Sequence, residues 1–294
     1  MKKIITILAS AAILLLSGCA GNTDTKQDKD SSLTACTSFY ALYDFTQKIG
    51  GDKVEVINMV PTGSEPHDWE PSSHDMLTIS NADILFYNGL GMESWIDSVK
   101  GSIGEDGVEY VSLSDGLADE NAADPHIWLD PQRVMQMTDK IAAEFAEKDS
   151  ENAEYYMQNA DSFKAELEKL DSDYQTALAP YQGKSIVVSH EAYSYLCSRY
   201  GLEQVAVEGV IPESEPSPEQ MKQIIDYINA NDIKYIFFEE LLSPKVVQTI
   251  ADSTGAELLE LNPFEGLSQE DIDAGEDYIS VMYENLENLK KVLE

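Results

Sequence analysis

Basic residues are scarce in this sequence. Lysine and arginine number 19 against 54 aspartates and glutamates, which gives a formal net charge of −35 at pH 7. Nucleic-acid binding and charge-driven adsorption to anionic lipid both need a basic surface, so the composition argues against both. Such acidity indicates a strongly soluble surface. It is compatible with attraction of cations but does not by itself select a cation binder.

Cysteine is rarer still, with three residues in 294. No Cys-x-x-Cys occurs, which excludes a thiolate zinc site of the usual spacing. Cys36 falls in a strand-like segment and Cys197 in a helical run of the other half of the chain. We therefore expect two separately buried thiols rather than a disulfide, although an extracellular location would permit one.

The N-terminus carries an apolar run, Ile4–Leu16, that is shorter than the about 20 residues a spanning helix needs. It follows two lysines and ends in Leu-Ser-Gly-Cys, which is typical of an export signal and resembles a bacterial lipobox. The lipobox resemblance implies cleavage before Cys19 and lipid attachment to it. We expect a lipoprotein signal peptide over 1–18 and a polar tether over 19–32. The alternative is an ordinary signal peptide with a chance cysteine.

Short β-branched runs alternate with longer helical patterns along the rest of the chain, which predicts parallel sheets. The interval Asn152–Ala179 has no strand signal but carries apolar and aromatic side chains at helical spacing up to Pro180. A helix of that length would measure roughly 40 Å at about 1.5 Å per residue, enough to connect two halves. We predict an α/β fold with two Rossmann-like lobes, 33–150 and 181–294, joined by one long rigid helix over 151–180.

Each expected element has a residue range. Strands are predicted at Leu33–Thr37, Val54–Met59, Ile84–Tyr87, Ser185–Ser189, Val205–Val207, Tyr235–Phe238 and Glu257–Leu261. Shorter helices are predicted at Tyr40–Ile49, Ser73–Ser80, Gln132–Ala146, Glu191–Tyr200, Pro218–Ala230, Pro244–Ser253 and Tyr278–Leu293.

Histidine is limited to four residues, and three of them share one setting. His67, His126 and His190 each lie in a loop or turn beside a predicted element, where open α/β sheets place their ligands. A lone histidine is more often a surface or satisfied core residue, and His74 receives that interpretation. Three imidazoles and one carboxylate would supply four donors that suit tetrahedral Zn²⁺ better than Mn²⁺.

Three stretches carry a resemblance to a known family. They are Pro-His-x-x-Glu-Pro at 66–71, Asp-Pro-His-x-Trp-Leu-Asp-Pro at 124–131 and Ser-His-x-Ala-x-x-Tyr at 189–195. They resemble the zinc/manganese-type (cluster A-I) solute-binding lipoproteins of bacterial ABC transporters, over a match from about Leu33 to Glu294. The family implies two α/β lobes with the metal between them. His190 indicates the zinc branch, because manganese members usually carry glutamate there.

The resemblance also implies a fourth ligand and a function. The Leu261–Gly266 segment is similar to a zinc-branch segment that supplies Glu265, while Glu239 and Glu240 remain competitors for that place. Asp124, Glu239 and Glu240 are candidates to orient the imidazoles. The implied protein is a monomeric, high-affinity zinc-binding component. It is lipid-anchored on the outer face of the cytoplasmic membrane and delivers Zn²⁺ to a membrane permease.

The sequence departs from the family in one segment and leaves other functions open. Many zinc members carry a histidine-rich loop, whereas Ser114–Pro125 is short and acidic and is interpreted as a solvated loop.

A manganese or iron carrier of the same family is the nearest alternative. A zinc-dependent surface enzyme would need an open metal position, and no His-Glu-x-x-His occurs. We expect no enzyme, and nothing in the residues supports a host-surface adhesin. Zinc affinity should fall below about pH 6.5 as histidines protonate.

Overall fold

The computed structural model describes residues 33–104, 107–118, 124–210 and 216–294. The predicted signal peptide (1–18), the lipid attachment site Cys19 and the tether (19–32) lie outside the described residues. Within the described ranges, no helix is both long enough and apolar enough to span a bilayer.

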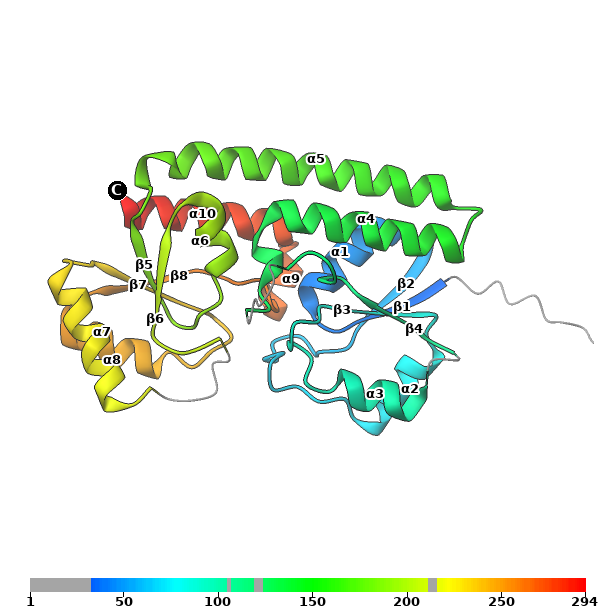
Figure 1. The fold of residues 1–294 in the computed structure, drawn as a ribbon, viewed down its shortest axis with the longest axis horizontal. Helices are drawn as coiled ribbons and strands as arrows, with labels where there is room; N and C mark the ends of the chain where they lie inside the picture. Colours follow the sequence, from blue (N-terminus) through cyan, green and yellow to red (C-terminus); the bar gives the residue numbers. More distant parts are fainter. Residues whose placement is uncertain (1–32, 105–106, 119–123, 211–215) are drawn as a thin grey trace, which may run out of the picture. The chain divides into compact units, whose positions relative to one another are not determined.

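Two four-stranded parallel sheets form the frame (Figure 1). The first contains β1 (Leu33–Thr37), β2 (Val54–Asn58), β3 (Ile84–Tyr87) and β4 (Glu109–Ser112), in the order β2-β1-β3-β4. The second contains β5 (Ser185–Val188), β6 (Glu203–Ala206), β7 (Tyr235–Phe238) and β8 (Glu257–Glu260), in the order β6-β5-β7-β8. The identical strand order in the two sheets confirms the predicted fold of two α/β lobes. In such sheets, loops at the carboxyl ends of the strands form the ligand site.

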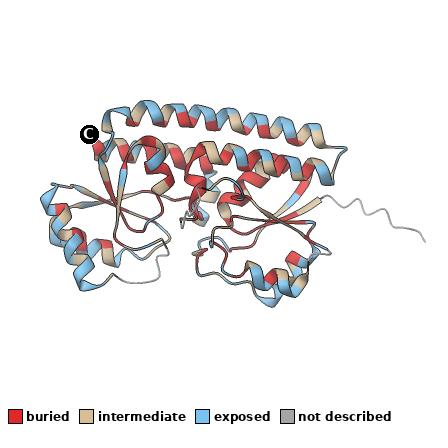
Figure 2. Ribbon diagram, in the orientation of Figure 1, coloured by how far each residue is buried: buried red, intermediate tan, exposed pale blue. Residues whose placement is uncertain are grey.

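Helices cover both faces of each sheet, which explains why the central strands are nearly continuous apolar runs (Figure 2). α2 (Ser73–Asn81) and α3 (Ile96–Ile103) bury one face of the first sheet, and α7 (Pro218–Ala230) and α8 (Lys245–Thr254) bury one face of the second. The opposite faces share one large core with five further helices. These are α1 (Tyr40–Gly50), α4 (Pro131–Lys148), α5 (Ala153–Leu178), α6 (Ser194–Tyr200) and α10 (Tyr278–Leu293).

Helix α5 is the predicted connecting helix, with 26 residues. It packs along α4 and α1 of the first lobe and along α10 and α6 of the second. Its buried Asp171 accepts hydrogen bonds from Gln132 on α4 at 3.0 Å and from Arg199 on α6 at 2.6 Å. One carboxylate on the helix therefore joins both lobes. A 3₁₀ turn (Ala179–Tyr181) that contains Pro180 ends the helix, because proline lacks the donor needed to continue it.

The predicted elements differ from the structure mainly at short segments. α6 begins at Ser194 rather than Glu191, and β6 begins at Glu203 rather than Val205. The sequence prediction missed β4, α3 and α9 (Gln269–Ala274). β4 was hidden because it is a four-residue edge strand whose residues are all half-exposed, so it shows no clear apolar pattern.

Cys36 and Cys197, the two cysteines among the described residues, are free and buried, as predicted. Burial raises the pKa of the Cys36 thiol to about 12, and the charge of Glu55 adds to the shift. Burial also raises the pKa of the Cys197 thiol to about 12. Both residues therefore remain neutral thiols at physiological pH and act as small apolar side chains.

Candidate metal centre

His67 lies in the loop between β2 and α2. Glu65 accepts a hydrogen bond from the backbone N–H of His67 at 3.0 Å, which fixes the loop at this residue. The loop ends at Ser72, whose side chain and that of Asp75 form a capping box at the start of α2. The imidazole of His67 is buried, with 2% of its side chain exposed. His74 lies on the surface of α2, outside the site, in agreement with its interpretation as a surface residue.

His126 lies just before α4, at the start of a 3₁₀ turn (Ile127–Leu129). One oxygen of Asp124, Oδ1, accepts its backbone N–H at 2.9 Å and lies 2.6 Å from its ring Nδ1. A carboxylate at Nδ1 places the ring proton there and leaves the lone pair on Nε2. Trp128 packs beside the ring, with ring centroids 5.1 Å apart. The sequence prediction of Asp124 as an orienting acid therefore agrees with the structure.

His190 follows β5 directly. Its Nδ1 lies 2.7 Å from Oε1 of Glu239, a buried residue that follows β7. The same oxygen accepts the hydroxyl of Ser189 at 2.7 Å. Glu239 therefore orients the imidazole of His190, as was considered from the sequence, and its Oε1 is not directed at the centre of the site.

Glu265 lies in the loop after β8. Asn262 accepts the backbone N–H of Phe264 at 2.8 Å, and Phe264 adopts a left-handed backbone conformation with φ of 58°. This turn buries the Phe264 ring in the core beside Tyr278 and directs Glu265 inward. Glu240, the other acid considered for the fourth place, is exposed and faces Asp271 on α9.

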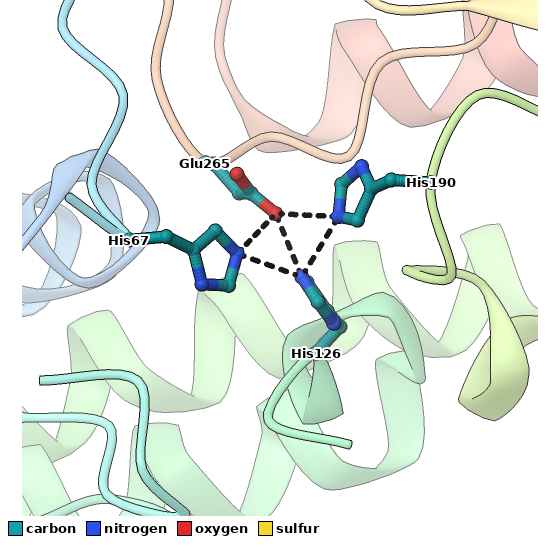
Figure 3. A group of neighbouring side chains, drawn as sticks. All are labelled: His67, His126, His190 and Glu265. Atoms are coloured by element: carbon teal, nitrogen blue, oxygen red, sulfur yellow. Dashed lines mark hydrogen bonds and ion pairs between the residues drawn. The ribbon is translucent and has the colours of Figure 1, made fainter. Parts of the chain in front are cut away.

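The four predicted side chains converge on one point (Figure 3). The Nε2 of His126 lies 3.2 Å from the Nε2 of His67 and 3.2 Å from that of His190. Oε1 of Glu265 lies 2.8 Å, 3.5 Å and 3.6 Å from the same nitrogens of His126, His67 and His190. Donors bound at about 2.0–2.1 Å to one tetrahedral ion would lie roughly 3.3 Å apart. These five distances lie near that value, and the four donor atoms all lie within 4.8 Å of one another, a grouping that could hold one metal ion.

Burial and charge oppose each other in this centre. Burial lowers the pKa of His190, but the adjacent Glu239 and Glu265 outweigh it and raise that pKa well above its ordinary value. His126 behaves in the same way, with Asp124 and Glu265 raising its pKa against burial. Burial raises the pKa of Glu265, but the three imidazoles outweigh it and hold that pKa well below its ordinary value. The carboxylates therefore favour protonated histidines in the metal-free site. A bound metal cation would take the place of these protons.

Sequence reasoning missed several supporting residues, although one signal was present. Glu65-Pro66-His67 and Asp124-Pro125-His126 share the pattern acid-proline-histidine, and both acids accept the backbone N–H of the histidine two residues later. Glu65 is also half-buried. Burial and then the charge of Glu265 raise the pKa of its carboxyl to about 7. Ser189 and Ser194, whose hydroxyls donate to the carboxylates behind His190 and His126, show no comparable sequence pattern.

The fold and the candidate metal centre together define a class of protein. It is a two-lobed binding protein in which each lobe supplies two donors to the candidate metal centre. A model of the zinc-uptake complex component A family, ZnuA, matches residues 36–292. The chain belongs to this family. A high-affinity zinc uptake system protein ZnuA of Bacillus subtilis is 36% identical, over 99% of this chain and 98% of the relative.

Two further comparisons agree. The zinc-binding lipoprotein AdcA of Streptococcus pneumoniae is 33% identical over 99% of this chain, which spans 61% of the length of that relative. The crystal structure of the Zn(II)-bound ZnuA-like domain of AdcA from S. pneumoniae is 34% identical, with a TM-score of 0.80 over 90% of this chain and 99% of that one. The family prediction made from the three histidine motifs is thereby confirmed.

Proposed function

We propose that this protein is the extracellular zinc-capturing component of an ABC importer. It binds Zn²⁺ through His67, His126, His190 and Glu265 and delivers the ion to a membrane permease. The observation that carries the proposal is the convergence of three imidazole nitrogens and one carboxylate oxygen, all within 4.8 Å of one another. The names of the relatives, a zinc uptake protein and a zinc-binding lipoprotein, point to the same ion.

The donor set favours zinc over its alternatives. Imidazole nitrogen suits Zn²⁺, whereas Mn²⁺ sites are rich in carboxylate and water oxygen. Four protein donors around the ion leave no open position for a water or a substrate, and a catalytic zinc site keeps one. We therefore propose binding and release without catalysis. A manganese carrier and a zinc enzyme are both less consistent with this centre.

The mechanism requires the two lobes to act together. His67 and His126 come from the lobe of β1–β4, and His190 and Glu265 from the lobe of β5–β8, so a bound ion bridges the lobes. The carboxylates of Asp124 and Glu239 hold two imidazoles with Nε2 directed inward. Zinc binding displaces protons from the raised-pKa histidines, and release to the permease returns them.

The rest of the chain is assigned on the same proposal. Residues 1–18 are a lipoprotein signal peptide, and Cys19 carries the lipid that holds the protein at the outer face of the cytoplasmic membrane. Residues 19–32 form a tether, 33–150 and 181–294 the two lobes, and 151–180 the connecting helix. The protein acts as a monomer and does not bind nucleic acid, consistent with its net charge of −35.

Elemental analysis of the purified protein tests the proposal directly. We expect one zinc ion per chain after dialysis against trace metals, and calorimetry with Zn²⁺ and Mn²⁺ should show tighter binding of zinc. Stoichiometric manganese or iron in place of zinc would overturn the metal assignment. A water molecule as fourth ligand in a zinc-bound crystal structure would reopen the enzyme alternative.

Replacing His190 with glutamate should shift the metal preference toward manganese. The variant keeps four donors but exchanges an imidazole for a carboxylate. Removing a residue that only orients a ligand costs about 10–100-fold in metal affinity, and changing the ligand itself should lower zinc affinity by more than that. The new carboxylate would lie beside Glu239, and the variant is therefore compared with His190→Glu combined with Glu239→Gln. Unchanged relative affinity for Zn²⁺ and Mn²⁺ in a competition titration of both variants would contradict the role of His190.

A further inference from the structure

We infer that Ser194 is a positioning residue that couples the zinc ligand His126 to the opposite lobe and slows release of the ion. The inference rests on the proposed zinc binding. Ser194 is the first residue of α6, in the lobe of β5–β8, and its hydroxyl donates to Oδ2 of Asp124. The other oxygen of Asp124 holds both the ring and the backbone of His126. One carboxylate therefore connects a ligand of the first lobe to a helix of the second.

His190 has the same arrangement of a carboxylate and a serine behind its ring, but these hydrogen bonds stay within one lobe. Ser189 donates to Glu239, and Glu239 accepts Nδ1 of His190, all within the lobe of β5–β8. Each of these histidines thus has a carboxylate behind it that also accepts a serine hydroxyl. Of these two serine hydrogen bonds, the one from Ser194 joins the two lobes and would have to break if they moved apart, whereas the one from Ser189 would not. Ser189 and Ser194 can therefore be compared directly, because each donates to a carboxylate behind a histidine and only one of the two hydrogen bonds crosses between the lobes.

Other ties between the lobes lie deeper. Trp128 donates from Nε1 to the carbonyl of Pro263 at 2.7 Å, and Tyr278 donates to the carbonyl of Trp128 at 2.7 Å. Both aromatic rings are fully buried, so these bonds are shielded from water. The Asp124 side chain is 13% exposed, and Ser194 is half-buried. The bond between Ser194 and Asp124 lies nearer to solvent, where water can replace a lost partner.

From this position Ser194 affects the orientation of the ligand His126 rather than the stability of the fold. Without the hydroxyl, Asp124 loses the contact that holds it from the other lobe and becomes freer to rotate away from Nδ1 of His126. An imidazole whose orientation is no longer held binds metal more weakly. Because differences in affinity between closely related complexes arise mostly in dissociation, the effect should appear in the rate of zinc release.

The experiment measures zinc release from the full-length protein into an excess of chelator by stopped flow. We expect Ser194→Ala to release zinc on the order of tenfold faster, at the low end of what removing a ligand-orienting partner costs. Ser194→Thr keeps the hydroxyl and should restore slow release. Ser253→Ala, on the exposed face of α8, is the surface control and should match the wild type. Wild-type release rates in Ser194→Ala would overturn the inference.

A double-mutant cycle with Asp124→Asn separates positioning from general structural damage. Ser194 acts through Asp124, so Ser194→Ala should add little to the effect of Asp124→Asn on the release rate. Ser189→Ala acts through Glu239 and should combine with Asp124→Asn additively. Additive behaviour of Ser194→Ala would overturn the inference. Failure of the wild-type protein to bind zinc would instead overturn the proposed function, so the two failures are distinguishable.

Discussion

Replacement of His126 by alanine is expected to raise the zinc dissociation constant roughly 100- to 1000-fold while the metal-free fold is retained. A closed zinc site of this kind contributes about 10–16 kcal/mol, so an equal share per ligand is about 3 kcal/mol, and every 1.4 kcal/mol is a factor of ten. His126 is the most central of the four ligands, with its Nε2 3.2 Å or less from one donor atom of each of the others.

The measurement compares isothermal titration with zinc-dependent thermal stability. Zinc at about 100 times its dissociation constant stabilises the wild-type fold by about 2.7 kcal/mol, and most of this gain should disappear in His126→Ala. The matched control is His74→Ala, which makes the same substitution on the exposed surface of α2 and should bind zinc like the wild type. Wild-type zinc affinity in His126→Ala would contradict the proposed ligand set.

Sequence reasoning was most successful where periodicity is strong. The strands Ile84–Tyr87 and Tyr235–Phe238 and the helix Tyr278–Leu293 have the predicted bounds, because buried apolar runs and a one-sided apolar helix leave clear patterns. The structure brings the three predicted histidines together with Glu265, which followed from the family resemblance rather than from its own local pattern. Their role as metal ligands remains a prediction.

What could not be predicted depends on contacts between distant segments. Glu239 and Glu240 are neighbours in the sequence, and only the direction of the chain after β7 decides that Glu239 contacts His190 while Glu240 lies on the surface beside Asp271. Ser194 is separated by 70 residues from the carboxylate that it contacts, and serine at a helix start has no distinguishing pattern. Such pairings follow from the packing of the two lobes, which local propensity does not determine.

Zinc affinity is expected to fall steeply on acidification, with onset above the ordinary histidine pKa of about 6.5 rather than below it. Adjacent carboxylates raise the pKa of His126 and His190 against the effect of burial, so the metal-free rings bind protons at higher pH. Below those raised pKa values, each proton that zinc must displace increases the dissociation constant about tenfold per pH unit. These two histidines alone therefore predict an increase of roughly 100-fold per unit.

Glu265 should contribute nothing to this slope, because its pKa is held well below its ordinary value and the carboxylate stays ionised near neutral pH. Competition titrations from pH 7.5 to 5.5, together with calorimetry in buffers of different ionisation enthalpy, would count at least about two protons released per zinc at the acidic end. In Glu239→Gln the negative charge beside His190 is lost, the pKa of that histidine falls, and its share of the slope moves to lower pH. A dissociation constant that is constant over the range, or a wild-type profile in Glu239→Gln, would contradict this account. The pH at which zinc is released is therefore determined by the carboxylates behind the histidines as much as by the histidines themselves.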